Sequence, residues 1–189
     1  MKWLLLVVFS LGLSACKTVP VKQSMSSDVQ LDLSKIEIKG KNLYKAMKSD
    51  DATDPPTSRE ADLLEMASKD LLCGDGYIAV RVEDELSQIE HIYLMFQPEK
   101  SKGIQFGRHI RFDFKLGTND IKSVISSTKS CLLVPLEDSS TDAAFVTHVL
   151  SDVPTDFHVY LSLHHKKPIY IRTSSNLWKI ENGKILQSK

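Results

Sequence analysis

The chain lacks an excess of either charge, because its 24 Lys and Arg residues are matched by 24 Asp and Glu residues. This balance gives no reason to expect a nucleic-acid partner or an anionic surface. Beyond the first sixteen residues, no apolar run reaches the ~20 residues that a membrane-spanning helix requires. The chain also lacks an internal repeat and a coiled-coil heptad pattern, which excludes repeat and coiled-coil architectures.

Recognisable catalytic patterns are missing as well. The sequence contains no Gly-x-Ser-x-Gly elbow, no set of penicillin-binding motifs and no glycine-rich phosphate loop. Asp75-Gly76-Tyr77-Ile78 matches the middle of a calcium-binding loop, but Leu71, Cys73 and Val82 occupy positions where that loop needs ligands. We therefore expect no catalytic residue, no cofactor and no metal, although a triad assembled from distant residues stays open.

The histidines form no recognisable ligand set. His91, His109 and His158 fall at the polar positions of alternating patterns, which predicts a solvated sheet face. His164 and His165 precede a lysine pair and are expected at a hairpin tip. None of the six histidines stands at a recognisable catalytic spacing from an acid.

The N-terminus carries the most specific pattern. Lys2 precedes an apolar run from Trp3 to Leu13, which is too short to cross a ~30 Å hydrocarbon core and predicts a signal peptide over residues 1–15. Leu13-Ser14-Ala15-Cys16 resembles the lipobox of bacterial lipoproteins. That resemblance implies a lipid on the Cys16 thiol and a protein that is anchored in the membrane without spanning it. The alternative is an ordinary signal peptide followed by a cysteine at this place by chance.

Residues 16–28 are short, polar and contain Pro20, so we expect a lipidated N-terminus and tether there. Lys17 stands where retention in the inner membrane usually shows Asp, which resembles the sorting pattern of outer-membrane lipoproteins. The expected location is the periplasm, at the inner leaflet of the outer membrane.

With Cys16 assigned to lipid, Cys73 and Cys131 remain as a pair in an oxidising compartment, and we predict a disulfide between them. Two free buried thiols are the alternative. Half of a metal site is a weaker alternative still, because a structural zinc site usually shows a Cys-x-x-Cys spacing that is absent here.

Alternating apolar residues predict a mainly β domain over residues 29–189, with a β-rich part at 76–186. One amphipathic helix is expected near 58–72, where Thr57 and Glu60 have capping-box spacing. The Asn182-Gly183 pair predicts a tight hairpin. We expect an antiparallel β-sandwich, immunoglobulin-like, with strands at residues 29–38, 77–82, 92–96, 110–116 and 157–163 and weaker candidates at 132–136 and 145–150.

Four basic residues, Arg108, His109, Arg111 and Lys115, lie on or beside one predicted strand. They could form a docking strip for an acidic protein. A solvated strand face is the preferred interpretation, because Asp113 dilutes the positive charge.

The region from Cys73 to Leu186 resembles small Gram-negative lipoproteins described as type VI secretion immunity proteins. The resemblance rests on Cys73 before the strand Tyr77–Val82, on Cys131 before Leu132–Val134 and on Val159–Leu163 before a final hairpin. It implies a protein-binding function in the periplasm, with a secreted toxin as the partner and no catalytic residue. A structural or assembly adaptor of the envelope and a hydrolase with an unrecognised site are the alternatives.

Overall fold

The computed structural model describes residues 27–49, 54–68, 72–74, 76–96, 103–135 and 143–188. The predicted signal peptide, Cys16 and most of the predicted tether lie outside these residues. The helices are α1 (Ser27–Ala46), α2 (Ser58–Ser68) and α3 (Asp156–His165). The strands are β1 (Tyr77–Asp84), β2 (Ile89–Phe96), β3 (Gly103–Gln105), β4 (Ile110–Lys115), β5 (Ile121–Ser126), β6 (Leu133–Pro135), β7 (Ala144–Thr147), β8 (Ile169–Arg172), β9 (Leu177–Glu181) and β10 (Lys184–Ser188).

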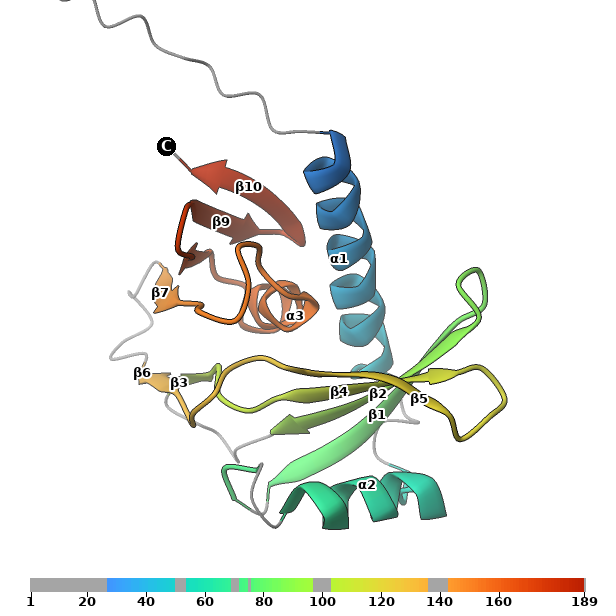
Figure 1. The fold of residues 1–189 in the computed structure, drawn as a ribbon. Coiled ribbons are helices and arrows are strands. Elements are labelled where there is room, and N and C mark those ends of the chain that lie inside the picture. Colours follow the sequence, from blue (N-terminus) through green and yellow to red (C-terminus); the bar gives the residue numbers. More distant parts are fainter. Residues whose placement is uncertain are drawn as a thin grey trace, which may run out of the picture.

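The elements form layers (Figure 1). The first sheet has the strand order β1-β2-β4-β5 and the second sheet the order β10-β9-β8-β7, while β3 and β6 make a small pair. Helix α2 covers one face of the first sheet, and α3 lies between its other face and the second sheet. Helix α1 runs along the side and packs against α3. The fold is therefore mainly β with antiparallel sheets in a sandwich-like arrangement, as predicted.

Three features differ from the predicted fold. The immunoglobulin-like character is not confirmed, since β7 and β8 are parallel and are connected through α3. The described residues form three helices rather than one. The predicted strand at 157–163 is wrong, because those residues belong to α3. All residues from Asp156 to Ser162 are buried, so this helix has no polar face and shows no helical period in the sequence.

The predicted strand at residues 29–38 is also wrong, because this segment lies in α1, which begins at Ser27. Its buried side continues from Leu33 through Glu37 and Gly40 to Leu43, at helical spacing. Because Glu37 and Gly40 are not apolar, the sequence does not show a continuous apolar stripe at helical spacing. Gly40 is needed where α1 crosses α3: a Cβ there would lie 2.5 Å from the Val159 Cβ and 2.7 Å from the Asp156 carbonyl oxygen.

Several local predictions are confirmed. Helix α2 starts with the predicted capping box, in which Thr57 N donates to Glu60 Oε2 at 2.7 Å. Strands β1, β2 and β4 appear where alternation predicts them. β9 and β10 meet in the predicted turn, with Asn182 at φ 51° and Gly183 at φ 71°, the left-handed values that this turn requires.

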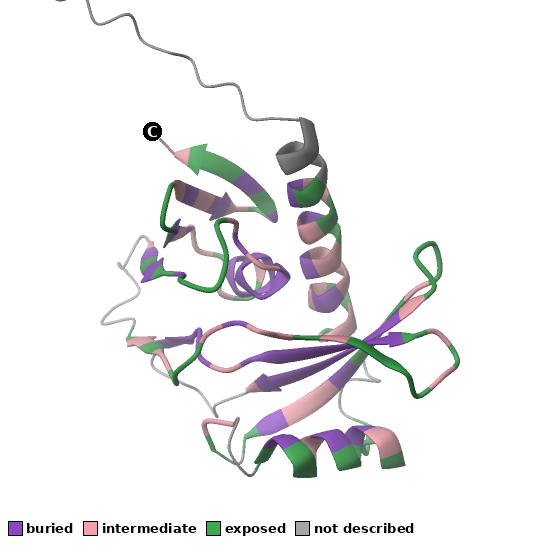
Figure 2. Ribbon diagram, in the orientation of Figure 1, coloured by how far each residue is buried: buried purple, intermediate pink, exposed green. Residues whose placement is uncertain are grey.

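Both faces of the two inner strands of the first sheet, β2 and β4, are covered, contrary to the single buried face expected. Every residue of β2 from Glu90 to Met95 is buried, and so are five residues of β4 (Figure 2). The apolar positions of the alternation, such as Ile92 and Phe112, face α2. The polar positions therefore face α1 and α3 rather than solvent.

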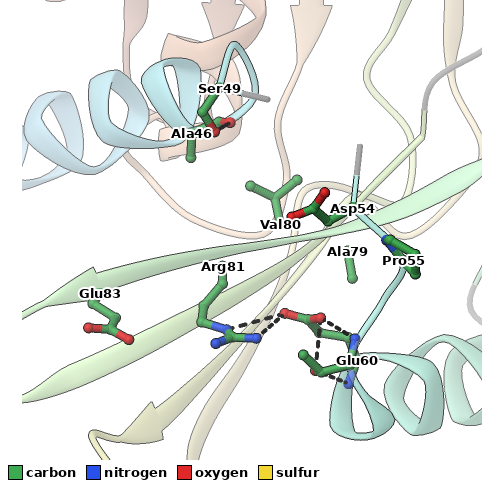
Figure 3. Close-up of a pocket in the computed structure, with 10 residues that line it drawn as sticks. Ala46, Ser49, Asp54, Pro55, Glu60, Ala79, Val80, Arg81 and Glu83 are labelled. Atoms are coloured by element: carbon green, nitrogen blue, oxygen red, sulfur yellow. Dashed lines mark hydrogen bonds and ion pairs between the residues drawn. The ribbon is translucent and has the colours of Figure 1, made fainter. Parts of the chain in front are cut away.

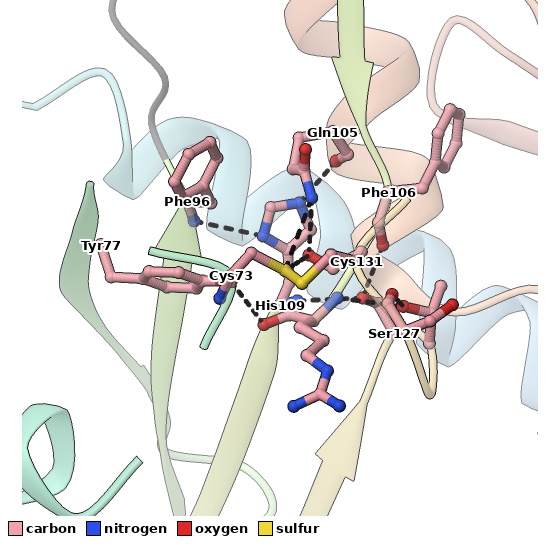
Figure 4. The surroundings of a disulfide bond; sticks show 12 residues. Cys73, Tyr77, Phe96, Gln105, Phe106, His109, Ser127 and Cys131 are labelled. Atoms are coloured by element: carbon pink, nitrogen blue, oxygen red, sulfur yellow. Dashed lines mark hydrogen bonds between the residues drawn. A yellow bond between two sulfur atoms is a disulfide. The ribbon is translucent and has the colours of Figure 1, made fainter. Parts of the chain in front are cut away.

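The predicted disulfide between Cys73 and Cys131 is present, with a Cα–Cα distance of 5.6 Å (Figure 4). It ties the segment before β1 to the segment before β6, beside Gly107. A Cβ on Gly107 would lie 2.1 Å from the Leu132 backbone nitrogen, so the two backbones pass in direct contact. Tyr77 completes the junction, because its hydroxyl accepts from Cys73 N at 3.1 Å and donates to the Arg108 carbonyl at 3.2 Å.

Candidate functional site

Between the first sheet and α3 lies a buried charge cluster made of His91, Arg111, Asp113 and Asp156. His91, Asp113 and Ser123 are register partners across β2, β4 and β5. His91 Nδ1 lies 2.6 Å from Asp113 Oδ1, and Arg111 Nε donates to the same oxygen at 2.7 Å. Arg111 also pairs with Asp156 on α3. The cluster therefore connects the sheet to the helix.

The charges of this cluster stabilise one another. Burial alone would raise the pKa of Asp113, but the hydrogen bonds from His91, Arg111 and Ser123 lower it well below its usual range. Burial would likewise lower the pKa of Arg111, and the charge of Asp156 raises it instead. Nearby Lys39 on α1 has a lowered pKa, because of burial first and the Arg111 charge second.

The cluster is closed to solvent, and this corrects the interpretation of the basic residues on β4. Arg111 is 6% exposed and His109 is 1% exposed, so neither belongs to a docking strip or to a solvated face. These residues are buried because α1 and α3 cover the face of the sheet that was expected to be solvated. Because a partner cannot reach these groups, we assign the cluster a structural role.

The predicted solvated histidines are buried too. His109 Nε2 lies 2.7 Å from the Gln105 carbonyl oxygen and its Nδ1 accepts from Phe96 N, which fixes one neutral tautomer. Burial lowers the pKa of His109 to about 4. The pKa of His158 is well below its usual value, because of burial first and then the charge of His148. Among the described residues, no group of His, Cys, Asp and Glu side chains could hold a metal ion.

The outer face of the second sheet carries exposed apolar and aromatic side chains. Phe145 of β7 and Tyr170 of β8 are register partners, and their rings stack with centroids 4.6 Å apart and planes 9° apart. Phe145 is 66% exposed. We name Phe145, Tyr170, Arg172 and Leu177 the aromatic face. These four residues share a shallow hollow of about 280 Å³.

A second hollow, of about 390 Å³, lies next to the hollow of the aromatic face, and Thr147 lines both. Two exposed apolar residues, Val149 and Leu150, extend the surface in this direction. The hollow also contains a serine–histidine contact, because Ser151 Oγ lies 3.1 Å from His148 Nε2. The hydroxyl makes its shorter hydrogen bond to the Val153 carbonyl, so its proton is directed away from the imidazole. This geometry does not activate Ser151 as a nucleophile.

A third hollow, of about 560 Å³, lies beside β1 (Figure 3). The last residue of α1, Ala46, and Ser49 just after it contribute to its wall, and the start of α2 contributes Glu60. Arg81 of β1 donates to Glu60 Oε1 at 3.0 Å. Its lining mixes charged residues, such as Arg81 and Glu83, with apolar ones, such as Ala79 and Val80, unlike the apolar surface around Phe145.

Of the predicted site residues, the structure brings Cys73 and Cys131 together, and Cys16 lies outside the described residues. Sequence reasoning missed the aromatic face. The alternation of Ile169, Tyr170, Ile171 and Arg172 is the signal that could have indicated an exposed side there.

Comparisons with known proteins give no family, because no family model, no curated protein and no solved structure matches this chain. Within the described part of the chain, no helix is long and apolar enough to cross a membrane.

Proposed function

We propose that the protein is a lipid-anchored periplasmic lipoprotein that acts by binding another protein, and that this partner is a toxic effector delivered by type VI secretion. The lipobox-like Leu13–Cys16 segment supports the anchor. The resemblance to type VI secretion immunity lipoproteins supports the kind of partner. The observation that carries the binding role is the aromatic face on the second sheet.

The aromatic face has the composition of a protein-binding surface. Aromatic residues and arginine contribute most of the energy in many interfaces, and a contiguous exposed apolar patch often marks such a site. The stacked rings of Phe145 and Tyr170 lie on paired strands, so binding restricts little side-chain freedom. Arg172 is exposed beside them and makes no ion pair with the described residues. The surface thus favours a partner with apolar and acidic groups.

The lipid anchor would keep the folded domain, and therefore its contact with the partner, close to the membrane surface. A fully extended chain from Cys16 to the start of α1 at Ser27 spans at most ~40 Å. Substitution Cys16→Ser is expected to abolish incorporation of a radiolabelled fatty acid, as measured by metabolic labelling and immunoprecipitation. A variant that is labelled as strongly as the wild type would contradict the lipid anchor.

The decisive experiment uses the lipidated protein in cells that make their own secreted effectors. The wild type is expected to co-purify with one toxin in stoichiometric amount, identified by mass spectrometry, and to protect cells that receive this toxin. A double variant, Phe145→Ser with Tyr170→Ser, is expected to lose both properties. Leu86→Ser is the matched control, because Leu86 is a fully exposed apolar residue in the turn between β1 and β2.

Two results would overturn the proposal. Recovery of envelope-assembly components without a toxin would identify an adaptor instead of an immunity protein. A double variant that captures and neutralises the toxin as well as the Leu86→Ser control does would exclude the aromatic face as the binding surface.

A further inference from the structure

The outer edge of β1 is a separate surface, on the first sheet rather than the second. β1 pairs with β2 on one side, and no strand of the described residues pairs with its other side. In an antiparallel pair, every second residue turns its N–H and C=O groups away from the partner strand. Over its eight residues, β1 therefore presents a row of backbone donors and acceptors along this edge.

This edge lacks three of the features by which proteins protect an exposed strand, namely a short length, a bulge and a proline. It carries a fourth, charged side chains, in Arg81, Glu83 and Asp84. β1 keeps unbroken register with β2 from Tyr77 to Asp84 and contains neither proline nor glycine. By contrast, the opposite edge strand β5 pairs through a register shift, and the edge strand β7 has only four residues. The β1 edge is thus the longest regular one in the described part of the chain.

Among the described residues, a hollow lies directly beside this edge. The hollow of about 560 Å³ is lined by Ala79, Val80, Arg81 and Glu83, over which β1 rises about 14 Å. The C-terminal end of α1 stands on one side of the sheet and the start of α2 on the other (Figure 3). These two walls leave a groove that has the sheet edge as its floor.

The charges around the groove are unequal. Arg59 and Arg81 are balanced by Glu60 and Glu90, to which they are paired at 2.7–3.3 Å. Asp54 and Glu83, which also line the groove, have no ion pair with the described residues. Asp54 therefore has no positive partner among the described residues, and Glu83 shares Arg81 with Glu60 and Glu90, so carboxylates outnumber cations around the groove.

We infer that the outer edge of β1 binds an extended basic peptide segment of a partner protein, which joins the first sheet as a fifth strand. Its backbone would pair with the free donors and acceptors of β1, the usual source of affinity in strand addition. Alternation sets its side-chain pattern. Residues on the α1 side meet Val80 and Ala46, and residues on the α2 side meet Glu83. The preferred segment thus alternates apolar and basic residues.

The test uses the full-length lipidated protein in detergent micelles and a capped eight-residue peptide of alternating Lys and Val. Fluorescence anisotropy measures binding, and hydrogen exchange with mass spectrometry measures protection of residues 77–84. The Lys–Val peptide is expected to bind and to slow exchange in β1. The same peptide N-methylated at alternate amides, which cannot pair with β1, and a Glu–Val peptide are expected not to bind.

A pair of charge-reversal variants separates the groove from general electrostatics. Asp54→Lys with Glu83→Lys is expected to weaken Lys–Val binding about tenfold. Asp62→Lys with Glu65→Lys makes the same change in net charge on the exposed side of α2 and is expected to change binding less than about twofold. Equal binding of the Glu–Val peptide, or binding without protection of residues 77–84, would overturn the inference. This outcome is independent of the aromatic face, since the two sites lie on different sheets.

Discussion

Gly40 allows the backbones of α1 and α3 to approach closely, and its replacement is expected to force them apart. In Gly40→Ala, the new methyl group would overlap Val159 and the Asp156 carbonyl group. We expect a loss of about 1–3 kcal/mol in the free energy of unfolding, which outweighs the gain of up to about 1 kcal/mol in helix propensity. Urea denaturation measures the change. Lys35→Ala on the exposed side of α1 is the control, and an equal stability of the two variants would contradict the prediction.

Arg111 compensates two buried carboxylates, and no other arginine takes part in the buried charge cluster. In Arg111→Met, Asp156 loses its ion pair and Asp113 keeps only His91 and Ser123. Removing one partner of a buried ion pair destabilises a protein by about 3–5 kcal/mol. The control is Lys115→Met, which changes an exposed lysine on the same strand. Its free energy of unfolding, measured by urea denaturation, is expected to differ from that of the wild type by about 0.5 kcal/mol or less. Similar effects of both substitutions would show that the cluster does not stabilise the fold.

At the scale of elements, the disulfide joins the segments before β1 and β6 across 58 residues of sequence. In the loop-entropy account, a crosslink of this span contributes on the order of 4 kcal/mol by restricting the unfolded chain. The double variant Cys73→Ser with Cys131→Ser is expected to lose stability of this order in denaturation experiments. A reductant should lower the stability of the wild type similarly and leave that of the variant unchanged. Equal stabilities without reductant would disprove this role.

The strands and turns were predictable wherever a short stretch of sequence decides the structure. Ile92 and Leu94 alternate with polar residues, Thr57 and Glu60 cap a helix, and Asn182 starts a tight turn, all without help from distant residues. The segment from Phe157 to Leu163 was not predictable in this way. Its polar residues are buried by partners elsewhere in the chain, which removes the helical pattern.

That single error also concealed the candidate site. Because α3 was taken for a strand, the parallel connection from β7 to β8 could not be foreseen, and this connection places Phe145 beside Tyr170. The buried charge cluster was missed for a related reason. Alternation separates the two faces of a strand, but it does not reveal that helices cover both of them.

For the whole molecule, the buried histidines predict sensitivity to acid. His109 has a pKa of about 4 in the folded protein, against about 6.5 when unfolded, because burial disfavours the charged imidazole. The unfolded chain therefore binds more protons at intermediate pH, so stability is full above about pH 6.5 and falls as the pH decreases toward 4. This one group accounts for roughly 3 kcal/mol at pH 4.

Urea denaturation between pH 7.5 and pH 4.5 measures this dependence. The free energy of unfolding is expected to decrease steadily below pH 6.5, and His109→Gln is expected to show a shallower slope. Identical slopes in the wild type and the variant would mean that His109 is not held neutral by the fold.

The contact between α1 and α3 also affects the order in which parts of the chain can reach their native packing. Gly40 lies near the beginning of the described chain and its neighbour Val159 near the end, and Arg111 depends on Asp156 in the same way. A polypeptide that emerges N-terminus first would expose the inner face of the first sheet until α3 has emerged. Native packing on that face waits for α3, whereas α2 can already cover the other face of the sheet.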